Sequence, residues 1–258
     1  PIRPEQKWAN LQEYHELYDG GHTIEGAVAH YEATGRRHFL DAMCRYADLL
    51  VKTFGRGPDQ IRGYCGHPEI ELALMKLHRV TGNPAYLELA GFFIDERGRR
   101  PYYFDLEREK LQASGLPFFK WYQPGQYVPC QAHQPLVEQR DAVGHAVRAL
   151  YLYSGAVDVA AARGDTALLA ACRRLWKSVT RRRMYVTGGV GSTAIGEAFT
   201  FDFDLPDESG YAETCANIAL AFFAHRLLQI EPAADYADVL ERALYNGILS
   251  GVSMDGRK

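Results

Sequence analysis

The feature that most constrains the fold of this chain is one helix–turn–helix phrase that recurs four times. In each copy an apolar, helix-like run ends at a short turn, and a new run opens with an aromatic residue or Leu that has Ala within the next four positions. The turns lie at 33–35, 80–82, 162–164 and 230–232. Gly35, Gly82 and Gly164 stand where a helix end needs a left-handed residue. The sequence therefore predicts a chain of helical hairpins.

The two helices of a hairpin differ in polarity, which predicts where each one lies. Residues 146–162 and 216–230 are apolar nearly all round, as expected of inner helices buried on most faces. Residues 165–180 and 234–245 have one apolar stripe and one charged face, as expected of outer helices. This alternation predicts an all-α fold, an α/α toroid whose inner helix ends frame a central cavity. Since four hairpins would not close such a ring, we expect the chain to be part of a longer one.

Composition excludes several classes of protein. The 258 residues are 47% hydrophobic, enough for a large core, and no apolar stretch approaches the length of about 20 residues that a membrane helix needs. The N-terminus does not resemble a signal peptide. A net charge of −3 gives no electrostatic footprint for nucleic acid. We therefore predict a protein that binds neither membrane nor nucleic acid.

Cysteine usage indicates the compartment. The five cysteines are an odd number, widely spaced and without a C-x-x-C motif, which argues against a disulfide framework. A reducing compartment, and hence a cytoplasmic location, is the prediction.

Two connections, about 96–144 and about 181–212, are long for a compact fold, and loops of that length are usually functional. The first is rich in aromatic rings. The second carries four residues, 188–191, of which three are Gly, then Glu197, then an acidic segment at 202–208. The glycines lack the Lys-Ser/Thr of a phosphate loop, and the acidic segment lacks EF-hand spacing. A nucleotide site is rejected, and a solvated acidic loop is favoured over a calcium site.

Glu213 and Cys215 lie two positions apart at the start of a strongly apolar helix. A helix N-terminus favours a carboxylate and pushes a thiol towards thiolate. The pair could therefore ligate a metal. The alternative is a helix-terminal acid beside a small buried Cys, and spacing alone favours this alternative.

His22, His67 and His145 each follow a Gly at the expected mouth of an inner helix. One such His is usually a cap or a satisfied polar group, whereas three equivalent placements would direct three imidazoles at one ring opening. Both interpretations stay open at this point. The remaining histidines show no such pattern and are interpreted as surface or core residues: His15, His30, His38, His78, His133 and His225.

Six segments together resemble glycoside hydrolase family 127, the β-L-arabinofuranosidase family, and they occur in the same order and at similar spacing as in that family. They are residues 21–31, 64–69, 141–148, 185–191, 196–199 and 211–217. The resemblance implies a catalytic domain built as an (α/α)6 barrel, with residues 1–258 as part of it and with N- and C-terminal parts of the family's chain absent. It implies a retaining glycosidase that releases L-arabinofuranose or a similar sugar from β-linked glycans or glycoconjugates.

The same resemblance implies a role for each candidate residue. Glu213 and Cys215 match two of four Zn²⁺ ligands, Glu197 matches the general acid/base, and His22, His67 and His145 match residues that hydrogen-bond the sugar. A retaining glycosidase usually employs two carboxylates. In this family a zinc-bound cysteine is the nucleophile, because zinc keeps the sulfur deprotonated near neutral pH.

The family's nucleophile and remaining zinc ligands come from a Cys-Cys pair, and no such pair exists in these residues. Half of a tetrahedral ligand set should bind zinc poorly. We therefore predict that this polypeptide alone is inactive. Nothing in the spacing of Cys65 or Cys130 favours either as a replacement ligand.

Two other interpretations stay open. One is an α/α-barrel sugar epimerase or isomerase that needs no metal and takes the histidines as bases. The other is a non-catalytic helical module that binds carbohydrate or a protein through the ring-rich loop. The sequence does not decide between a monomer and a homodimer.

Overall fold

The structure is a computed structural model that describes residues 4–116 and 123–257. The chain divides into two compact units, the first ending at Leu136 and the second beginning at Val137. In the described part of the chain no helix is long and apolar enough to cross a membrane.

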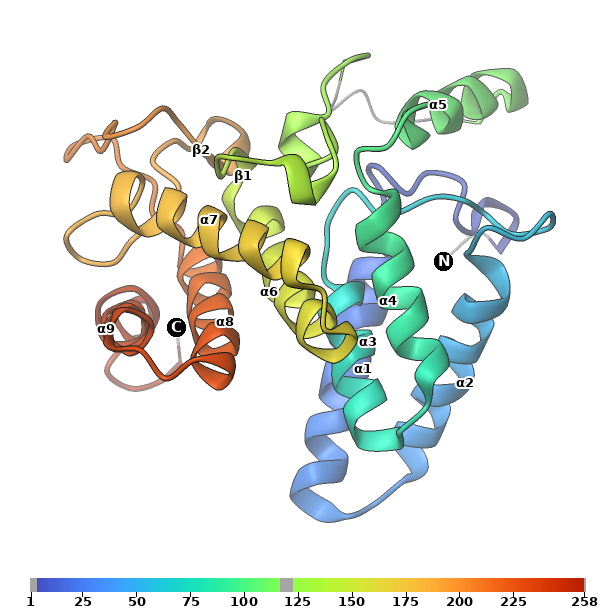
Figure 1. Cartoon of the computed structure of the whole chain (residues 1–258), viewed down its shortest axis with the longest axis horizontal. Coiled ribbons are helices and arrows are strands. Elements are labelled where there is room, and N and C mark those ends of the chain that lie inside the picture. The colour runs from blue at the N-terminus through green and yellow to red at the C-terminus, as the bar shows by residue number, and fades with distance from the viewer. Residues whose placement is uncertain (1–3, 117–122, 258) are drawn as a thin grey trace. The chain divides into compact units, whose positions relative to one another are not determined.

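The first unit contains two helical hairpins (Figure 1). Helices α1 (Glu16–Thr34) and α2 (His38–Thr53) form one, and α3 (Ile70–Thr81) and α4 (Pro84–Glu96) form the other. Helix α1 packs against both α2 and α3, and α3 also packs against α4. Helices α1 and α3 are therefore the inner pair of this unit.

The second unit repeats the plan (Figure 1). Its hairpins are α6 (Ala146–Arg163) with α7 (Thr166–Arg182), and α8 (Thr214–Ile230) with α9 (Ala234–Arg242). Helices α6 and α8 pack against each other, and each packs against its own outer helix. Nearly all of α6 is buried, as its uniformly apolar sequence predicts. A π-helical turn at Ala243–Ile248 continues α9 and packs on α8.

The predicted helix ends are confirmed. Gly35, Gly82 and Gly164 cap α1, α3 and α6 with φ of 70°, 72° and 65°. Each donates its backbone N–H to a carbonyl of the preceding turn. The helix that follows then starts from a side-chain cap in two cases, since Asn83 and Asp165 accept hydrogen bonds from Ala85 N and Leu168 N.

One helix was not expected from the sequence. Helix α5 (Tyr103–Ser114) lies within the first long connection, which the sequence analysis describes as a loop. It buries only Phe104, Glu107 and Leu111. Because one of these three is a carboxylate, the apolar periodicity that signals a helix is too weak to detect.

A buried ion pair ties the first unit together. The Arg97 guanidinium and the Glu71 carboxylate are both fully buried and lie 3.1 Å apart. Arg97 also donates to the carbonyl oxygens of Cys65 and Cys130, each at 2.9 Å. A guanidinium with this many acceptors anchors the segment that leads to His67.

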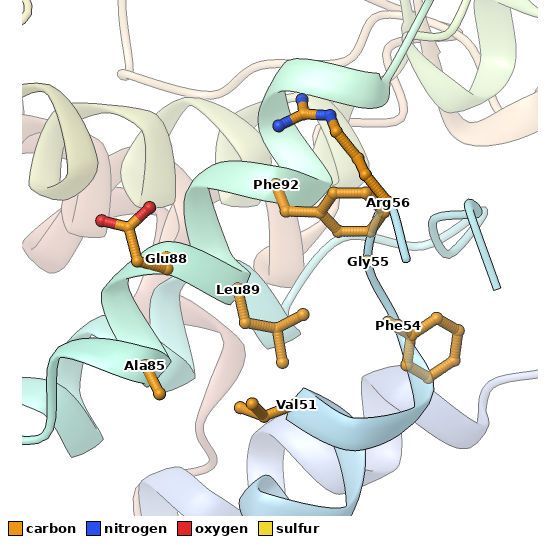
Figure 2. A pocket seen from close by; sticks show the side chains of 8 residues that line it. All are labelled: Val51, Phe54, Gly55, Arg56, Ala85, Glu88, Leu89 and Phe92. Atoms are coloured by element: carbon orange, nitrogen blue, oxygen red, sulfur yellow. The ribbon is translucent and has the colours of Figure 1, made fainter. Parts of the chain in front are cut away.

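A surface groove lies between the C-terminal end of α2 and helix α4 (Figure 2). Its lining is mainly apolar, from Val51, Phe54, Leu89 and Phe92, and Arg56 lies over the Phe92 ring. None of the predicted site residues lines it.

Candidate functional site

His22 and His67 of the first unit meet around one tyrosine. The Tyr18 ring centroid lies 4.5 Å from that of His22 and 4.2 Å from that of His67. His15 completes the group at 5.6 Å from His67. Neither the place of His15 in this group nor the role of Tyr18 can be predicted from the sequence, because the rings of such a cluster follow no regular spacing along the chain.

The expected placement of His22 at a helix mouth is wrong. Helix α1 begins at Glu16, so His22 lies inside it. Two glycines in the helix misleadingly suggest a helix start. Gly21 instead makes room for a neighbour, because an added Cβ would lie 2.7 Å from Cγ of Glu69. His67 lies in the segment before α3, and His145 is the N-cap residue of α6, as expected.

The His22 imidazole lies among charged side chains. Its Nδ1 is 3.4 Å from Oε1 of Glu69, whose side chain is fully buried. Burial lowers the pKa of His22, and the nearby carboxylates of Glu25 and Asp19 only partly oppose this effect. A neutral imidazole at pH 7 can both donate to and accept from a sugar hydroxyl.

His22, Glu25 and Glu69 also bring three potential metal ligands within 4.8 Å of one another. However, the Lys76 ammonium lies 2.6 Å from Oε1 of Glu25 and already supplies a positive charge there. This charge balance favours a hydrogen-bonding cluster rather than a cation site.

In the second unit, a short strand pair joins His145 to Glu197. Strand β1 (Gly144–His145) pairs antiparallel with β2 (Ala198–Phe199), so that His145 faces Ala198. Glu197 directly precedes β2, and His145 Nε2 lies 2.9 Å from its Oε2. Gly196 and Glu197 both have left-handed backbones, with φ of 68° and 50°. A left-handed non-Gly residue is uncommon and is typical of functional sites.

Tyr211 is a partner of Glu197 that the sequence analysis did not identify. Its hydroxyl donates to Oε1 of Glu197 at 2.9 Å, so both carboxylate oxygens of Glu197 have a partner. This hydrogen bond raises the pKa of Tyr211 to about 12. The residue lies in the 211–217 segment that resembles the family, but no spacing rule connects it to Glu197.

Glu213 and Cys215 lie at the start of α8, where Glu213 is the N-cap residue. Cys215 is exposed, so the alternative of a small buried Cys is wrong. Partial desolvation raises the pKa of the Cys215 thiol to about 11, and the nearby Glu213 carboxylate adds to the effect. The expectation that the helix N-terminus lowers this pKa is therefore wrong, because desolvation of the thiolate and, after it, the adjacent Glu213 carboxylate outweigh the helix dipole.

A carboxylate in contact with a thiol matches the donor chemistry of a zinc site. A divalent cation between them would relieve the repulsion that keeps the thiol protonated. Among the described residues, no third His, Cys, Asp or Glu joins this pair in a metal-binding group. The pair therefore offers two donors of the types that zinc accepts.

Cys65 and Cys130 do not fit as replacement ligands. Both are fully buried and lie against Arg97, with Cys65 Sγ 3.8 Å from its Nη2. A fixed guanidinium beside a sulfur atom disfavours a second cation there.

The loop before Glu213 is fixed by backbone hydrogen bonds. Tyr211 N donates to Ser192 O at 3.2 Å, and Ala212 N donates to Gly191 O at 2.9 Å. Close packing accounts for Gly189, since an added Cβ would lie 3.0 Å from Cβ of Ala212. Gly188 and Gly191 instead have left-handed backbones, with φ of 95° and 82°.

The acidic segment is only partly the solvated loop that the sequence predicts. Asp202 pairs with Arg182 at 2.7 Å and with Arg183 at 2.6 Å. Asp141 also pairs with both arginines. Asp207 and Glu208 are exposed, as expected.

The ring-rich connection serves packing where the structure describes it. Phe104 is buried against Tyr64, and Tyr102 stacks on Tyr127 with centroids 3.9 Å apart. Four further rings of this connection lie outside the described residues: Phe118, Phe119, Trp121 and Tyr122.

Comparison with known proteins gives consistent matches along the chain. The model of the β-L-arabinofuranosidase GH127 catalytic domain matches residues 1–258. A non-reducing end β-L-arabinofuranosidase of Bifidobacterium longum subsp. longum is 42% identical over 254 residues, which is 98% of this chain and 38% of that protein.

Two solved structures resemble the chain closely. A GH127 β-L-arabinofuranosidase from Geobacillus stearothermophilus T6 has a TM-score of 0.93 at 57% identity, covering 99% of this chain and 40% of that one. A second GH127 β-arabinofuranosidase has a TM-score of 0.84 at 44% identity, covering 96% of this chain and 36% of that one. The chain thus spans about two fifths of its relatives' length. These matches and the helical hairpins confirm the all-α fold class of the α/α-toroid type, and closure into an (α/α)6 barrel stays a prediction.

Proposed function

Because the chain belongs to the family of GH127 β-L-arabinofuranosidase catalytic domains, we propose that the protein carrying it is a retaining glycoside hydrolase. Its substrate is an oligosaccharide or glycoconjugate with a β-linked L-arabinofuranose, as the printed activities of its relatives suggest. The observation that carries the proposal is the contact of His145 and Tyr211 with the two oxygens of Glu197.

Glu197 is the general acid/base of this proposal. A carboxyl group at this position transfers its proton to the glycosidic oxygen as the bond to the anomeric carbon breaks. In the second step the resulting carboxylate takes a proton from water. A side chain that is 42% exposed leaves room for substrate and water to reach it.

His22, His67 and His145 would bind sugar hydroxyls. The neutral His22 can act as donor or acceptor. His67 Nδ1 lies 3.1 Å from the Pro68 carbonyl, which can only accept, so Nδ1 is the donor in this contact and Nε2 is the ring nitrogen that would face a sugar hydroxyl. Whether the residues of the two units line one cavity stays a prediction.

Glu213 and Cys215 would hold the zinc ion, together with two cysteines outside these residues. When bound, zinc keeps its cysteine ligands deprotonated at neutral pH, which a sulfur nucleophile requires. Since the 258 residues contain no Cys-Cys pair, this polypeptide alone should lack activity.

The test is release of L-arabinose from a β-L-arabinofuranosyl disaccharide by the full-length protein. Glu197→Gln should lower kcat by roughly 100- to 10,000-fold. Glu208→Gln makes the same change at an exposed position of the same loop and should leave kcat unchanged. A wild-type protein that interconverts sugar epimers without zinc, or only binds carbohydrate, would contradict the proposal.

A further inference from the structure

Glu197 is held at both ends of its carboxyl group by two different segments of the second unit. His145 comes from the short strand pair, and Tyr211 comes from the loop that precedes α8. Each contact is 2.9 Å long, one to Oε2 and the other to Oε1. Both oxygens of the carboxyl group are therefore held, which restricts its rotation.

Tyr211 itself has a fixed position. The backbone hydrogen bonds of Tyr211 and Ala212 to Ser192 and Gly191 attach the segment to the loop that also carries Glu197. Ala212 has a left-handed backbone with φ of 42°, which turns the chain sharply between Tyr211 and Glu213. Asn217 holds the far side of this turn by donating to the carbonyl oxygens of Ala212 and Glu213.

Glu197 needs such support because its side chain is 42% exposed. An exposed glutamate has several accessible rotamers, and only some would direct its proton at a leaving oxygen. A single contact to His145 would still allow the carboxyl group to rotate about that contact.

We propose that Tyr211 is a positioning residue for the acid step of Glu197. Its hydroxyl donates to Oε1, and the carboxyl group is thereby oriented for transfer of its proton to the leaving oxygen while the electron pair of the breaking C–O bond moves to that oxygen. This role rests on the proposed function, since it requires Glu197 to be the general acid.

Leaving-group dependence distinguishes positioning of an acid from a structural role. A methyl glycoside has a poor leaving group and needs protonation, whereas a 4-nitrophenyl glycoside departs without it. The ratio kcat/KM reports the steps up to the first irreversible one, here cleavage of the glycosidic bond. The experiment compares methyl and 4-nitrophenyl β-L-arabinofuranoside with the full-length protein.

In Tyr211→Phe, kcat/KM for the methyl glycoside should fall about tenfold, the effect of one hydrogen bond to a carboxyl group that becomes charged as its proton leaves. The value for the 4-nitrophenyl glycoside should change less than about twofold, because that leaving group needs no proton. The double variant with Tyr211→Phe and Glu197→Ala should have the same kcat/KM for the 4-nitrophenyl glycoside as Glu197→Ala alone.

Tyr185→Phe is the matched control. It removes a tyrosine hydroxyl of the same loop region that donates to Pro206 O at 3.2 Å. This substitution should leave kcat/KM unchanged for both substrates. Equal losses on both substrates in Tyr211→Phe, or no loss on either, would overturn the positioning role. A wild-type protein inactive on both glycosides would instead overturn the proposed function.

Discussion

The His145 imidazole and the Glu197 carboxylate, which are far apart in sequence, are brought to 2.9 Å by a strand pair of two residues on each side. His145 is also the N-cap residue of α6, so one helix end and one strand register together determine the contact. The contact is therefore a property of the second unit alone.

We predict that His145→Ala lowers kcat/KM of the full-length protein by roughly 10- to 100-fold, because both a sugar contact and one partner of Glu197 are lost. Steady-state kinetics on an arabinofuranosyl disaccharide would measure this. His225→Ala removes an exposed imidazole from α8 and should have no effect. Equal activity of the two variants would contradict the role of His145.

Glu69 should support substrate binding through His22. Its buried carboxylate lies beside Nδ1 of that ring, so Glu69→Gln keeps the shape and removes the charge. We expect KM to rise by about tenfold with a smaller change in kcat, because the ring of His22 loses a charged neighbour. Glu32→Gln on the exposed face of α1 is the control. A fall in kcat at constant KM would argue against this assignment.

Glu107 should make stability depend on pH. It accepts hydrogen bonds from Leu11 N at 2.7 Å and Gln12 N at 2.9 Å, yet burial dominates and raises its pKa to about 7 from 4.5. The folded state therefore binds more protons than the unfolded state between pH 4.5 and 7. The free energy of unfolding should fall by about 3 kcal/mol as pH rises through this window.

Calorimetry of the full-length protein at pH 5 and pH 7.5 would test this effect. From pH 5 to pH 7.5 the Tm of the wild type should fall by several degrees more than the Tm of Glu107→Gln, since the amide does not titrate. The same difference in Tm for both proteins would show that Glu107 does not titrate in this range.

Zinc content should depend on the Glu213–Cys215 pair. The full-length protein should hold about one zinc ion, and Cys215→Ser should lose most of it, because a hydroxyl is a poor zinc ligand. Elemental analysis of the purified proteins gives the result directly. Cys44→Ser on α2 is the control, and a Cys215→Ser protein with full zinc content would exclude the pair as ligands.

The hairpins could be predicted from sequence because their signals are local. Gly35, Gly82 and Gly164 mark helix ends by backbone conformation alone, and the apolar run of α6 reports its own burial. Helix α5 was missed because a titratable residue, Glu107, occupies its buried face. The position of His22 was misjudged because Gly21 serves contact with Glu69 rather than a helix end.

The candidate site could be predicted only in part. Glu197, Glu213 and Cys215 were identified through the family resemblance, whereas Tyr211 was not. Its contact with Glu197 depends on left-handed residues at Glu197 and Ala212, and such residues other than Gly leave no mark in a sequence. The raised pKa of Cys215 likewise depends on how close Glu213 lies in space.

Azide rescue of Glu197→Ala tests the acid/base role of Glu197 directly, in the full-length protein with 4-nitrophenyl β-L-arabinofuranoside as substrate. Azide needs no general base, so it should replace water in the second step and restore turnover. We expect an L-arabinofuranosyl azide of β configuration, identified by NMR. An α-configured product, or turnover that azide leaves unchanged, would contradict the assignment of Glu197 as the acid/base of a retaining glycosidase.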